Sequence, residues 1–270
     1  MDKRPIGVFD SGLGGLAVVK ELMNVLPNES VVYFGDTGRV PYGSKSRETV
    51  LKYAMQDMAF LKSKNVKMII AACGTVSAVF LKEKKDVKNI TFTGVVEPAC
   101  KAAIAKTKNK NIGVIGTSAT VKSEAYKDYI KSIDSEINVF STDCPMFVHL
   151  VENGFFDANN EVAYLVAKEY LSFFEDKNID TLILGCTHYP LLEGVIKRVL
   201  GDGICLIDPG KETAEVAKAM LSEQDMLNSD GDAEYVYYVS DSQENFCQNA
   251  SRFLMKDIKD SAHTASVDNL

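Results

Sequence analysis

Short apolar segments alternate with longer amphipathic segments along most of the chain. A short apolar run is typical of a strand buried on both faces of a sheet, and apolar residues three and four positions apart are typical of one helix face. The stretch 66–72 is such an apolar run, whereas Val50, Ala54, Met58 and Leu61 follow the helical spacing. This alternation predicts an α/β fold with mostly parallel sheets.

The pattern predicts a definite order of elements. Strands are expected over residues 5–9, 30–34, 66–72, 91–96, 112–115, 137–140, 181–184, 206–208 and 235–239. Helices are expected over residues 16–26, 46–63, 76–84, 161–177, 191–200, 211–222 and 241–258, with others in the remaining gaps between strands. The polar residues from about 261 onward are expected to fray.

Two pairs of segments resemble each other within the chain. The segment I-G-V-F-D-S (6–11) is similar to I-G-V-I-G-T (112–117), and K-M-I-I-A-A-C-G-T (67–75) is similar to D-T-L-I-L-G-C-T-H (180–188). In both halves the polar loop comes first and the cysteine loop second. The repeat predicts two related α/β units that face each other, and chance similarity of buried strands is the alternative explanation.

The composition is that of an ordinary globular protein, because 46% of the 270 residues are hydrophobic and 25% are charged. This length suits one large domain or two of modest size. The net charge of -7, without a cluster of Lys and Arg, argues against a nucleic-acid partner. The N-terminus does not resemble a signal peptide, and no apolar run approaches the roughly 20 residues that span a bilayer. We therefore expect a cytoplasmic protein without membrane contact.

Six cysteines are scattered through the chain without a C-x-x-C pair: Cys73, Cys100, Cys144, Cys186, Cys205 and Cys247. In a reducing compartment each is expected to be a free thiol. The three histidines are too dispersed to indicate a zinc site, and the chain lacks a dinucleotide-binding G-x-G-x-x-G loop and a P-loop. We therefore expect neither a metal nor an organic cofactor.

Cys73 and Cys186 differ from the other cysteines in their position. Each follows a predicted strand and precedes a predicted helix, and Pro190 suits the first helical turn after Cys186. Ligands of open α/β sheets bind beyond the carboxyl ends of the strands, and a helix N-terminus favours negative charge and so lowers a thiol pKa. The pair therefore predicts a chemical role with thiolate character. For either cysteine alone, packing in the core is the simpler interpretation.

Other polar loops also follow predicted strands and suit a small zwitterion. The backbone N–H groups of the turn 41–44 are suited to a carboxylate. The candidate residues are Asp10, Ser11, Gly12, Asp36, Thr37, Pro41, Tyr42, Gly43, Ser44, Thr117, Thr120, Thr187 and His188. Each of them alone can be a turn or helix-cap residue, and their convergence at strand ends favours a binding site.

Three further features are interpreted as structural. Glu97-Pro98 and Asp208-Pro209 follow strands and are expected to mark chain crossings between the two units. His149 lies in an apolar segment, and His263 lies in the polar tail, where it is expected to have no specific role.

These motifs together resemble the glutamate racemases, members of the cofactor-independent aspartate/glutamate racemase superfamily. The matching segments run in order from residue 6 to about 210, which is most of the chain. They are I-G-V-F-D-S-G-L-G-G (6–15), Y-F-G-D-T-G-R-V-P-Y-G (33–43), A-A-C-G-T (71–75), G-V-V-E-P (94–98), G-V-I-G-T-S-A-T (113–120), C-P-M-F-V-H-L-V-E (144–152) and L-I-L-G-C-T-H-Y-P-L-L (182–192).

The resemblance implies two pseudo-symmetric α/β domains with mostly parallel sheets and the active site in the cleft between them. The first domain would hold residues 1–96 and 209–270, and the second would hold residues 97–208. The resemblance also implies reversible conversion of L-glutamate to D-glutamate for peptidoglycan synthesis, without a cofactor, by a homodimer.

The same resemblance implies roles for individual residues. Cys73 and Cys186 would be the two acid/base residues. Asp10 would assist Cys73, and His188, oriented by Glu152, would assist Cys186. The substrate would be held by Asp10, Ser11, Pro41, Tyr42, Gly43, Ser44, Gly74, Thr75, Thr117, Thr120, Thr187 and His188.

The chain departs from the family pattern at two places. The commoner residue after the first cysteine is Asn, whereas this chain has Gly74, which offers the substrate only a backbone N–H. Where the family often has Pro, this chain has His149, and lining the entrance, contacting a partner and sensing pH are alternatives for it.

Three other functions stay open at this point. One is racemisation of aspartate or another amino acid. The second is a thiol redox or metal-binding role of Cys73 and Cys186. The third is non-catalytic binding of an acidic amino acid.

Overall fold

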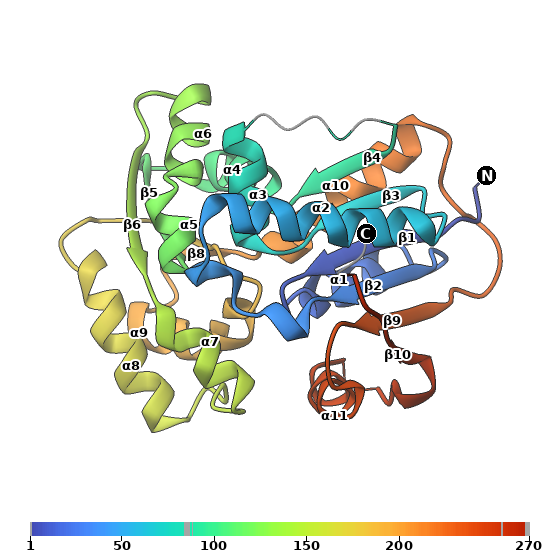
Figure 1. Cartoon of the computed structure of the whole chain (residues 1–270). Coiled ribbons are helices and arrows are strands. Elements are labelled where there is room, and N and C mark those ends of the chain that lie inside the picture. Colours follow the sequence, from blue (N-terminus) through green and yellow to red (C-terminus); the bar gives the residue numbers. More distant parts are fainter. Residues whose placement is uncertain (1, 84–86, 88, 255, 268–270) are drawn as a thin grey trace.

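The computed structural model describes residues 2–83, 87, 89–254 and 256–267, and consists of two α/β units, each with its own sheet (Figure 1). The first sheet has six parallel strands in the order β10-β9-β2-β1-β3-β4. Its strands are β1 (Ile6–Asp10), β2 (Val31–Gly35), β3 (Met68–Ala71), β4 (Thr91–Gly94), β9 (Tyr235–Val239) and β10 (Ala262–Thr264).

The second sheet has four parallel strands in the order β6-β5-β7-β8. Its strands are β5 (Asn111–Gly116), β6 (Asn138–Asp143), β7 (Thr181–Leu184) and β8 (Cys205–Ile207). In each unit the first strand in the chain lies between the second and the third, so β1 corresponds to β5 and β3 to β7. These are the two pairs of segments that resemble each other in sequence, and the common order confirms the predicted pseudo-symmetric α/β fold.

Helices cover both faces of each sheet. They are α1 (Leu16–Val25), α2 (Arg47–Ser63), α3 (Gly74–Glu83), α4 (Val96–Lys106), α5 (Ser118–Lys122), α6 (Ala125–Ile133), α7 (Pro145–Glu152), α8 (Glu161–Leu171), α9 (Glu193–Leu200), α10 (Pro209–Glu223) and α11 (Gln243–Leu254). In the first unit, Ile6 and Val8 pack with α1, α10 and α11, whereas the next residue, Phe9, packs with α2 and α3. This alternation is the two-residue period of a strand buried on both faces.

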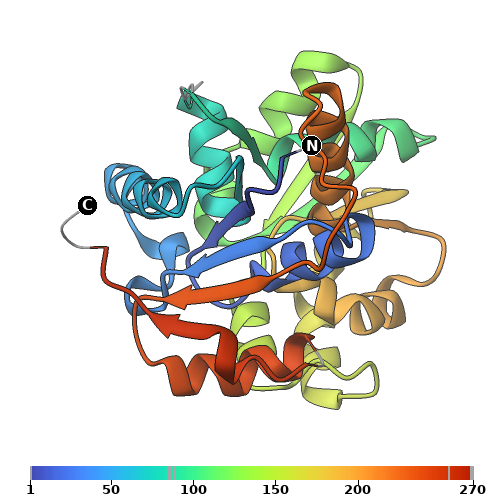
Figure 2. The same cartoon turned by 90° about the vertical axis from the view of Figure 1, so that its right-hand side faces the viewer.

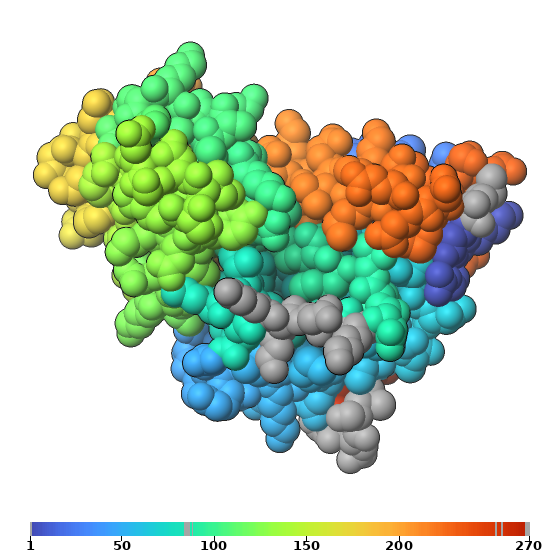
Figure 3. Space-filling model, turned by 90° about the horizontal axis from the view of Figure 1, so that it is seen from above, coloured from blue at the N-terminus to red at the C-terminus, as the bar shows by residue number. Residues whose placement is uncertain are grey.

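The second unit is layered in the same way. Ile112 and Val114 pack with α4 and α6, whereas Ile115 packs with α7, α8 and α9. Seen from above, this unit, mostly green and yellow, lies beside the first unit (Figure 3). Among the described residues, no helix is long and apolar enough to cross a membrane.

The expectation that the chain frays from about residue 261 is wrong. Strand β10 pairs in parallel with β9 at the edge of the first sheet, and Figure 2 shows these two strands in red and orange beside β2 in blue. Ala262 and Val267 are only 2% and 1% exposed. A three-residue strand among polar residues has too few apolar positions to show an alternating pattern. Residues 268–270 lie outside the described chain.

Several predicted boundaries also differ from the structure. The strand predicted over 91–96 ends at Gly94, so Glu97-Pro98 lie in the first turn of α4 and do not directly follow a strand. The helix predicted over 161–177 ends at Leu171 and is followed by a 3-10 turn, and the one predicted over 241–258 covers only residues 243–254. The predicted end of the third helix, Lys84, lies outside the described residues, as does residue 255.

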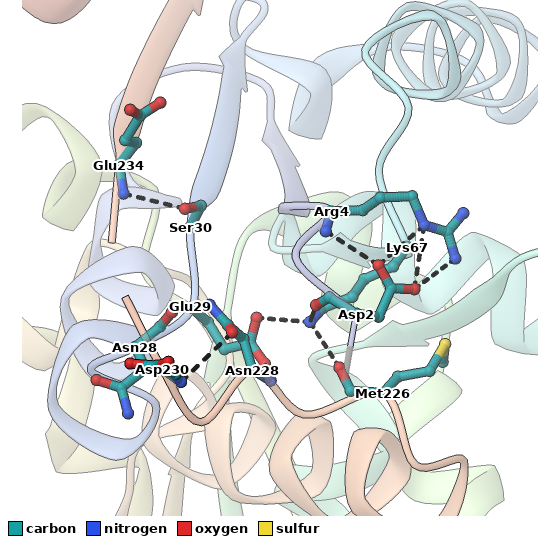
Figure 4. A network of polar contacts seen from close by, with 10 residues as sticks. All are labelled: Asp2, Arg4, Asn28, Glu29, Ser30, Lys67, Met226, Asn228, Asp230 and Glu234. Carbon is teal, nitrogen blue, oxygen red and sulfur yellow. Dashed lines mark hydrogen bonds and ion pairs between the residues drawn. The ribbon is translucent and has the colours of Figure 1, made fainter. Parts of the chain in front are cut away.

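A buried ion pair closes the amino-terminal end of the first sheet (Figure 4). Lys67 Nζ lies 2.6 Å from Glu29 Oε2, and the two side chains are 0% and 2% exposed. The same ammonium donates hydrogen bonds of 2.7 Å to the carbonyl oxygens of Asp2 and Met226, while Asn228 N donates to Glu29 Oε1 at 2.7 Å. The pair therefore connects the N-terminus, the start of β2 and the segment that leads from α10 back to β9.

We expect Lys67→Met to destabilise the protein by about 3–5 kcal/mol, because it leaves the Glu29 carboxylate buried without a counter-charge. The matched control is Lys20→Met on the exposed face of α1, where we expect a change within about 0.5 kcal/mol. Urea unfolding followed by circular dichroism measures both free energies. Equal stability of the two variants would contradict the structural role of the Lys67–Glu29 pair.

Candidate active site

Cys73 and Cys186 occupy corresponding positions in the two units. Cys73 is the second residue after β3 and directly precedes α3, and Cys186 is the second residue after β7 and lies three residues before a 3-10 helix at Tyr189–Leu192. Their side chains are buried, with 5% and 8% exposure. The two cysteine loops meet, because a Cβ added at Gly74, next to Cys73, would lie 2.7 Å from the carbonyl oxygen of Gly185, next to Cys186. The two thiols therefore lie in neighbouring loops at the carboxyl ends of both sheets.

The Cys73 thiol does not have the lowered pKa that its place before a helix predicts. Burial raises the pKa of Cys73 to about 12, and the negative charge of Asp10 acts in the same direction. The N–H of Val76 and the hydroxyl of Ser11, whose Oγ lies 3.7 Å from Cys73 Sγ, lower the pKa by less. Desolvation thus exceeds the effect of the helix N-terminus, and Cys73 is a neutral thiol near neutral pH.

Asp10 lies at the end of β1 in a tight glycine-rich loop. It is 1% exposed, and Gly12 N donates a 2.9 Å hydrogen bond to its Oδ2. Burial raises the pKa of Asp10, while the charge of His188 and the backbone N–H groups of this loop lower it by less. The loop is held from behind by Tyr33, whose Oη donates to the carbonyl of Gly12 at 2.7 Å. Asp10 is therefore coupled by its charge to both Cys73 and His188.

His188 links Cys186 to a carboxylate of the second unit. Its Nδ1 lies 3.7 Å from Cys186 Sγ, and its Nε2 lies 3.4 Å from Oε1 of Glu152, the last residue of α7. The second distance is that of an ion pair and is longer than an ordinary hydrogen bond. Burial lowers the pKa of His188, but its contacts with Cys186 and Glu152, together with the charge of Asp10, outweigh burial and raise it to about 10. The His188 ring therefore lies between the Cys186 sulfur and the Glu152 carboxylate.

The two units touch each other directly at the site. Thr75 Oγ1 at the start of α3 lies 3.4 Å from Thr117 Oγ1, and Thr117 Oγ1 lies 3.0 Å from Thr120 Oγ1. At Gly74, an added Cβ would lie 2.7 Å from the carbonyl oxygen of Gly185, which is backbone of the other unit. Glycine at position 74 therefore lets the two backbones approach more closely than a residue with a side chain would.

A cleft of about 1120 Å³ leads to this contact from outside. Its lining includes most residues of the turn after β2 together with residues of α3, α5 and α7. Of the candidates from the sequence, it includes Pro41, Gly43, Ser44, Thr75, Thr117, His149 and Glu152. Other candidates are buried and do not line this cleft, namely Asp10, Cys73, Thr120, Cys186, Thr187 and His188.

Tyr42 and Ser11 do not lie where a cleft-lining role would place them. The Tyr42 side chain is 1% exposed and its phenol contacts Asp36 and Asp57 instead of lining the cleft. Ser11 is only partly buried and contacts the Cys73 sulfur. Tyr42 therefore does not line the cleft, whereas its chain neighbours Pro41 and Gly43 do.

Sequence reasoning missed the charged residues around the cleft. Lys45, Arg47, Lys82 and Lys122 contribute to its lining, and Arg47 and Lys82 form ion pairs with Glu83 and Asp128. These lysines and arginines are scattered in sequence, so no local pattern indicates that they gather at one mouth. Among the described residues, no three His, Cys, Asp or Glu side chains are grouped so that they could hold a metal ion.

Comparison with known proteins gives a consistent picture. A family model described as Asp/Glu/Hydantoin racemase matches residues 7–217. The glutamate racemase of Geobacter metallireducens is 43% identical over 255 residues, which are 94% of each protein. Glutamate racemase 2 of Caldanaerobacter subterraneus subsp. tengcongensis is 45% identical over 258 residues, which are 96% of each.

Solved structures are similar along the whole chain. A glutamate racemase isoform from Bacillus anthracis superposes with a TM-score of 0.93 at 36% identity and 98% coverage of both chains. The glutamate racemase from Francisella tularensis in complex with D-glutamate has a TM-score of 0.91 at 41% identity and 100% coverage of both.

Relatives with more than 40% identity over nearly the whole chain are racemases, isomerases that act on a stereocentre, and this chain is of the same class. The chain belongs to the Asp/Glu/Hydantoin racemase family.

We expect Gly14→Ala to reduce kcat/KM for racemisation by about a hundredfold, because misplacing reacting groups by about 1 Å has an effect of this size. A Cβ at Gly14 would lie 2.7 Å from His188 Nδ1 and still closer to Thr187 Oγ1. The matched control is Gly203→Ala, since no atom lies within 4 Å of a Cβ at that position. Steady-state kinetics measures both variants, and an unchanged kcat/KM for Gly14→Ala would contradict the close contact.

We expect Glu152→Gln to lower the pKa of His188 from about 10 toward its ordinary value, because the nearby carboxylate favours the imidazolium. The raised pKa of His188 stabilises the folded protein fully below about pH 6.5, and this stabilisation is lost as the pH rises through about 10. In Glu152→Gln the loss on raising the pH should begin at a lower pH than in the wild type. NMR titration of the His188 ring measures the shift. The exposed Glu161→Gln is the control, and an unshifted midpoint in Glu152→Gln would show that the carboxylate has no influence.

Proposed function

We propose that this protein is a glutamate racemase that interconverts L- and D-glutamate by proton transfer between Cys73 and Cys186, without a cofactor. The observation that carries the proposal is the pair of buried thiols at corresponding strand ends of two facing units, each beside its own ionisable partner. The substrate is proposed from relatives above 40% identity that are named glutamate racemases, one of which was solved in complex with D-glutamate.

In this proposal the active site lies between a first domain, residues 1–96 with 209–270, and a second domain, residues 97–208. Strand membership supports the division, because β4 ends at Gly94 in the first sheet and β8 ends at Ile207 in the second. The contact between Thr75 and Thr117 supports a site shared by both domains.

Inversion of an α-carbon needs removal of a proton from one face and delivery of a proton to the other. A single base would have to cross the plane of the substrate, whereas two bases on opposite walls of a cleft need no such movement. One sulfur is then a thiolate that takes the α-proton, and the other is a thiol that gives its proton to the opposite face. After one turnover the two sulfurs have exchanged protonation states, and the reverse reaction restores them.

The electrostatics of the site support an unequal starting state. Burial keeps Cys73 a thiol, and the raised pKa of His188 keeps an imidazolium beside Cys186, where it stabilises a thiolate. The Asp10 carboxyl lies beside Cys73, and burial raises the pKa of Asp10 as well. Glu152 then holds the His188 ring in place from the other side.

The α-proton of an amino acid is far less acidic than a thiol, so the site must stabilise the carbanion. We assign this role to donors aimed at the substrate carboxylate, namely the backbone N–H groups of residues 42–44 and 74 and the hydroxyls of Thr75, Thr117, Thr120 and Thr187. The close contact of the two units excludes water and strengthens each of these interactions.

We further propose that the D-glutamate serves peptidoglycan synthesis in the cytoplasm and that the protein acts as a homodimer. Large apolar side chains that are exposed on the second unit support self-association. They are Met146, Phe155, Val162 and Leu165, which are 47%, 41%, 52% and 62% exposed. Analytical ultracentrifugation measures the oligomeric state.

We expect Cys73→Ala and Cys186→Ala each to lower racemisation of glutamate by at least about a hundredfold, because each removes one of the two proton-transfer groups. The exposed Cys205→Ala is the matched control and should keep full activity. Circular dichroism of purified protein with L-glutamate, without added cofactor, follows the reaction. A panel that includes L-aspartate tests the substrate.

Exchange with heavy water distinguishes two bases from one. With two thiols, each isomer gains α-deuterium mainly when it is converted into the other isomer. Rapid deuterium uptake without inversion, or racemisation in both directions by either alanine variant, would overturn the two-thiol scheme.

A further inference from the structure

A cluster of buried polar side chains lies behind the turn that lines the cleft. Tyr42 Oη is within hydrogen-bond distance of two carboxylates, contacting Asp36 Oδ2 and, at 2.9 Å, Asp57 Oδ2. Asp36 follows β2 and Asp57 comes from the middle of α2, and both are 0% exposed. One phenol oxygen thus connects the turn, the end of a strand and a helix.

Both carboxyl groups also have hydrogen-bond partners other than Tyr42. Arg39 donates from Nε to Asp36 Oδ2 at 2.6 Å and from Nη2 to Asp57 Oδ1 at 3.0 Å. Ser240, at the end of β9, donates to Asp36 Oδ1 at 2.7 Å. Arg39 also lies 4.1 Å from the ring centre of Tyr53. Asp36 therefore receives three donors, whereas Asp57 Oδ2 has only the phenol.

Two hydrogen bonds at the Tyr42 oxygen require one proton more than the cluster would have with Asp36 and Asp57 both ionised. A phenol has a single hydrogen and can donate to only one of the two carboxylates. The phenol is not ionised, because burial and the two carboxylates raise the pKa of Tyr42. The second contact is a hydrogen bond only if a carboxyl group donates to the phenol oxygen. Asp57 Oδ2 is the candidate, since every other contact to these carboxylates already has a donor.

Charge leads to the same assignment. With Asp57 neutral, Arg39 and Asp36 balance each other, whereas two ionised carboxylates would leave a net negative charge in a buried place. Burial raises the pKa of Asp57, and the charges of Asp36 and Asp10 raise it further, while the Tyr42 hydrogen bond and the Arg39 charge oppose them and are outweighed. The proton path is then Asp57 Oδ2–H to Tyr42 Oη, and Tyr42 Oη–H to Asp36 Oδ2.

We propose that Asp57 is a positioning residue whose retained proton holds the turn 41–44 in the shape that binds the substrate carboxylate. The inference rests on the proposed function, because the turn is assigned there to the carboxylate of glutamate. Tyr42 sits between Pro41 and Gly43, which line the cleft, so fixing its phenol from behind fixes their backbone in front. Asp57 does not line the cleft, so it acts through Tyr42.

The proposal predicts a pH dependence of substrate binding. As the pH rises and Asp57 loses its proton, two carboxylates face each other across Tyr42 with one arginine between them, and the turn loses one of its two anchors. KM for glutamate should then rise in alkaline solution with a smaller change in kcat, since the turn contributes to binding of both substrate and transition state.

Asp57→Asn tests the proton directly, because its amide is neutral at every pH, can donate to Tyr42 and can accept from Arg39. We expect KM within about twofold of the wild type at pH 7, and we expect the alkaline rise in KM to be reduced in this variant. Asp57→Ala and Tyr42→Phe, which break the chain of hydrogen bonds, should raise KM about tenfold or more. Tyr53→Phe, on the same helix, keeps its ring under Arg39 and is the matched control, with KM unchanged.

An infrared measurement needs no substrate and separates this inference from the proposed function. In deuterated buffer at pH 7 the difference spectrum, wild type minus Asp57→Asn, should contain the C=O band of a protonated, buried carboxyl group, and any band from Asp10, whose pKa burial also raises, cancels in it. A difference spectrum without this band, or a KM raised as strongly by Asn as by Ala at position 57, would overturn the proposal. If the wild type shows the band but does not racemise glutamate, the proton assignment holds and the proposed function and the role at the turn fail.

Discussion

The close approach of two parallel sheets at their carboxyl ends is the constraint on which the rest of the structure depends. Gly14 and Gly74 permit it, because a side chain at either position would meet the opposite unit. The contact buries Cys73, Cys186 and His188 together; burial raises the pKa of Cys73, and the neighbours of His188 raise its pKa against the effect of burial. A looser arrangement would leave two exposed thiols of ordinary pKa and no enclosed site.

The two halves of the site differ in charge although their strands correspond. Cys73 has a carboxyl neighbour, Asp10, whose charge disfavours a thiolate, whereas Cys186 has an imidazole neighbour, His188, that favours one. Pseudo-symmetry therefore supplies two thiols at equivalent places, and the residues around them make the thiols unequal. This inequality suits chemistry in which one sulfur takes a proton while the other gives one.

Buried ionisable residues support the first sheet at both of its ends. At the amino-terminal end Lys67 and Glu29 connect the N-terminus to the segment before β9. At the carboxyl end Asp36, Asp57 and Arg39 hold the turn that lines the cleft. Each cluster is costly to bury and strongly destabilising to break, so each specifies one arrangement of the segments that it joins.

The sequence by itself determined the α/β class, nearly all strands, the internal repeat and the position of both cysteines, because hydrophobic period and strand-end loops are local properties. It also indicated the family through its motifs. Only the tertiary structure decided the sign of the Cys73 pKa shift, since the desolvating atoms come from distant segments. Only the tertiary structure also showed the burial of the Tyr42 side chain, the cluster around Asp57 and the pairing of β10. Asp57 shares the buried face of α2 with Ala54 and Leu61. Its partners Arg39 and Tyr42 follow β2, so no local pattern can show that they meet.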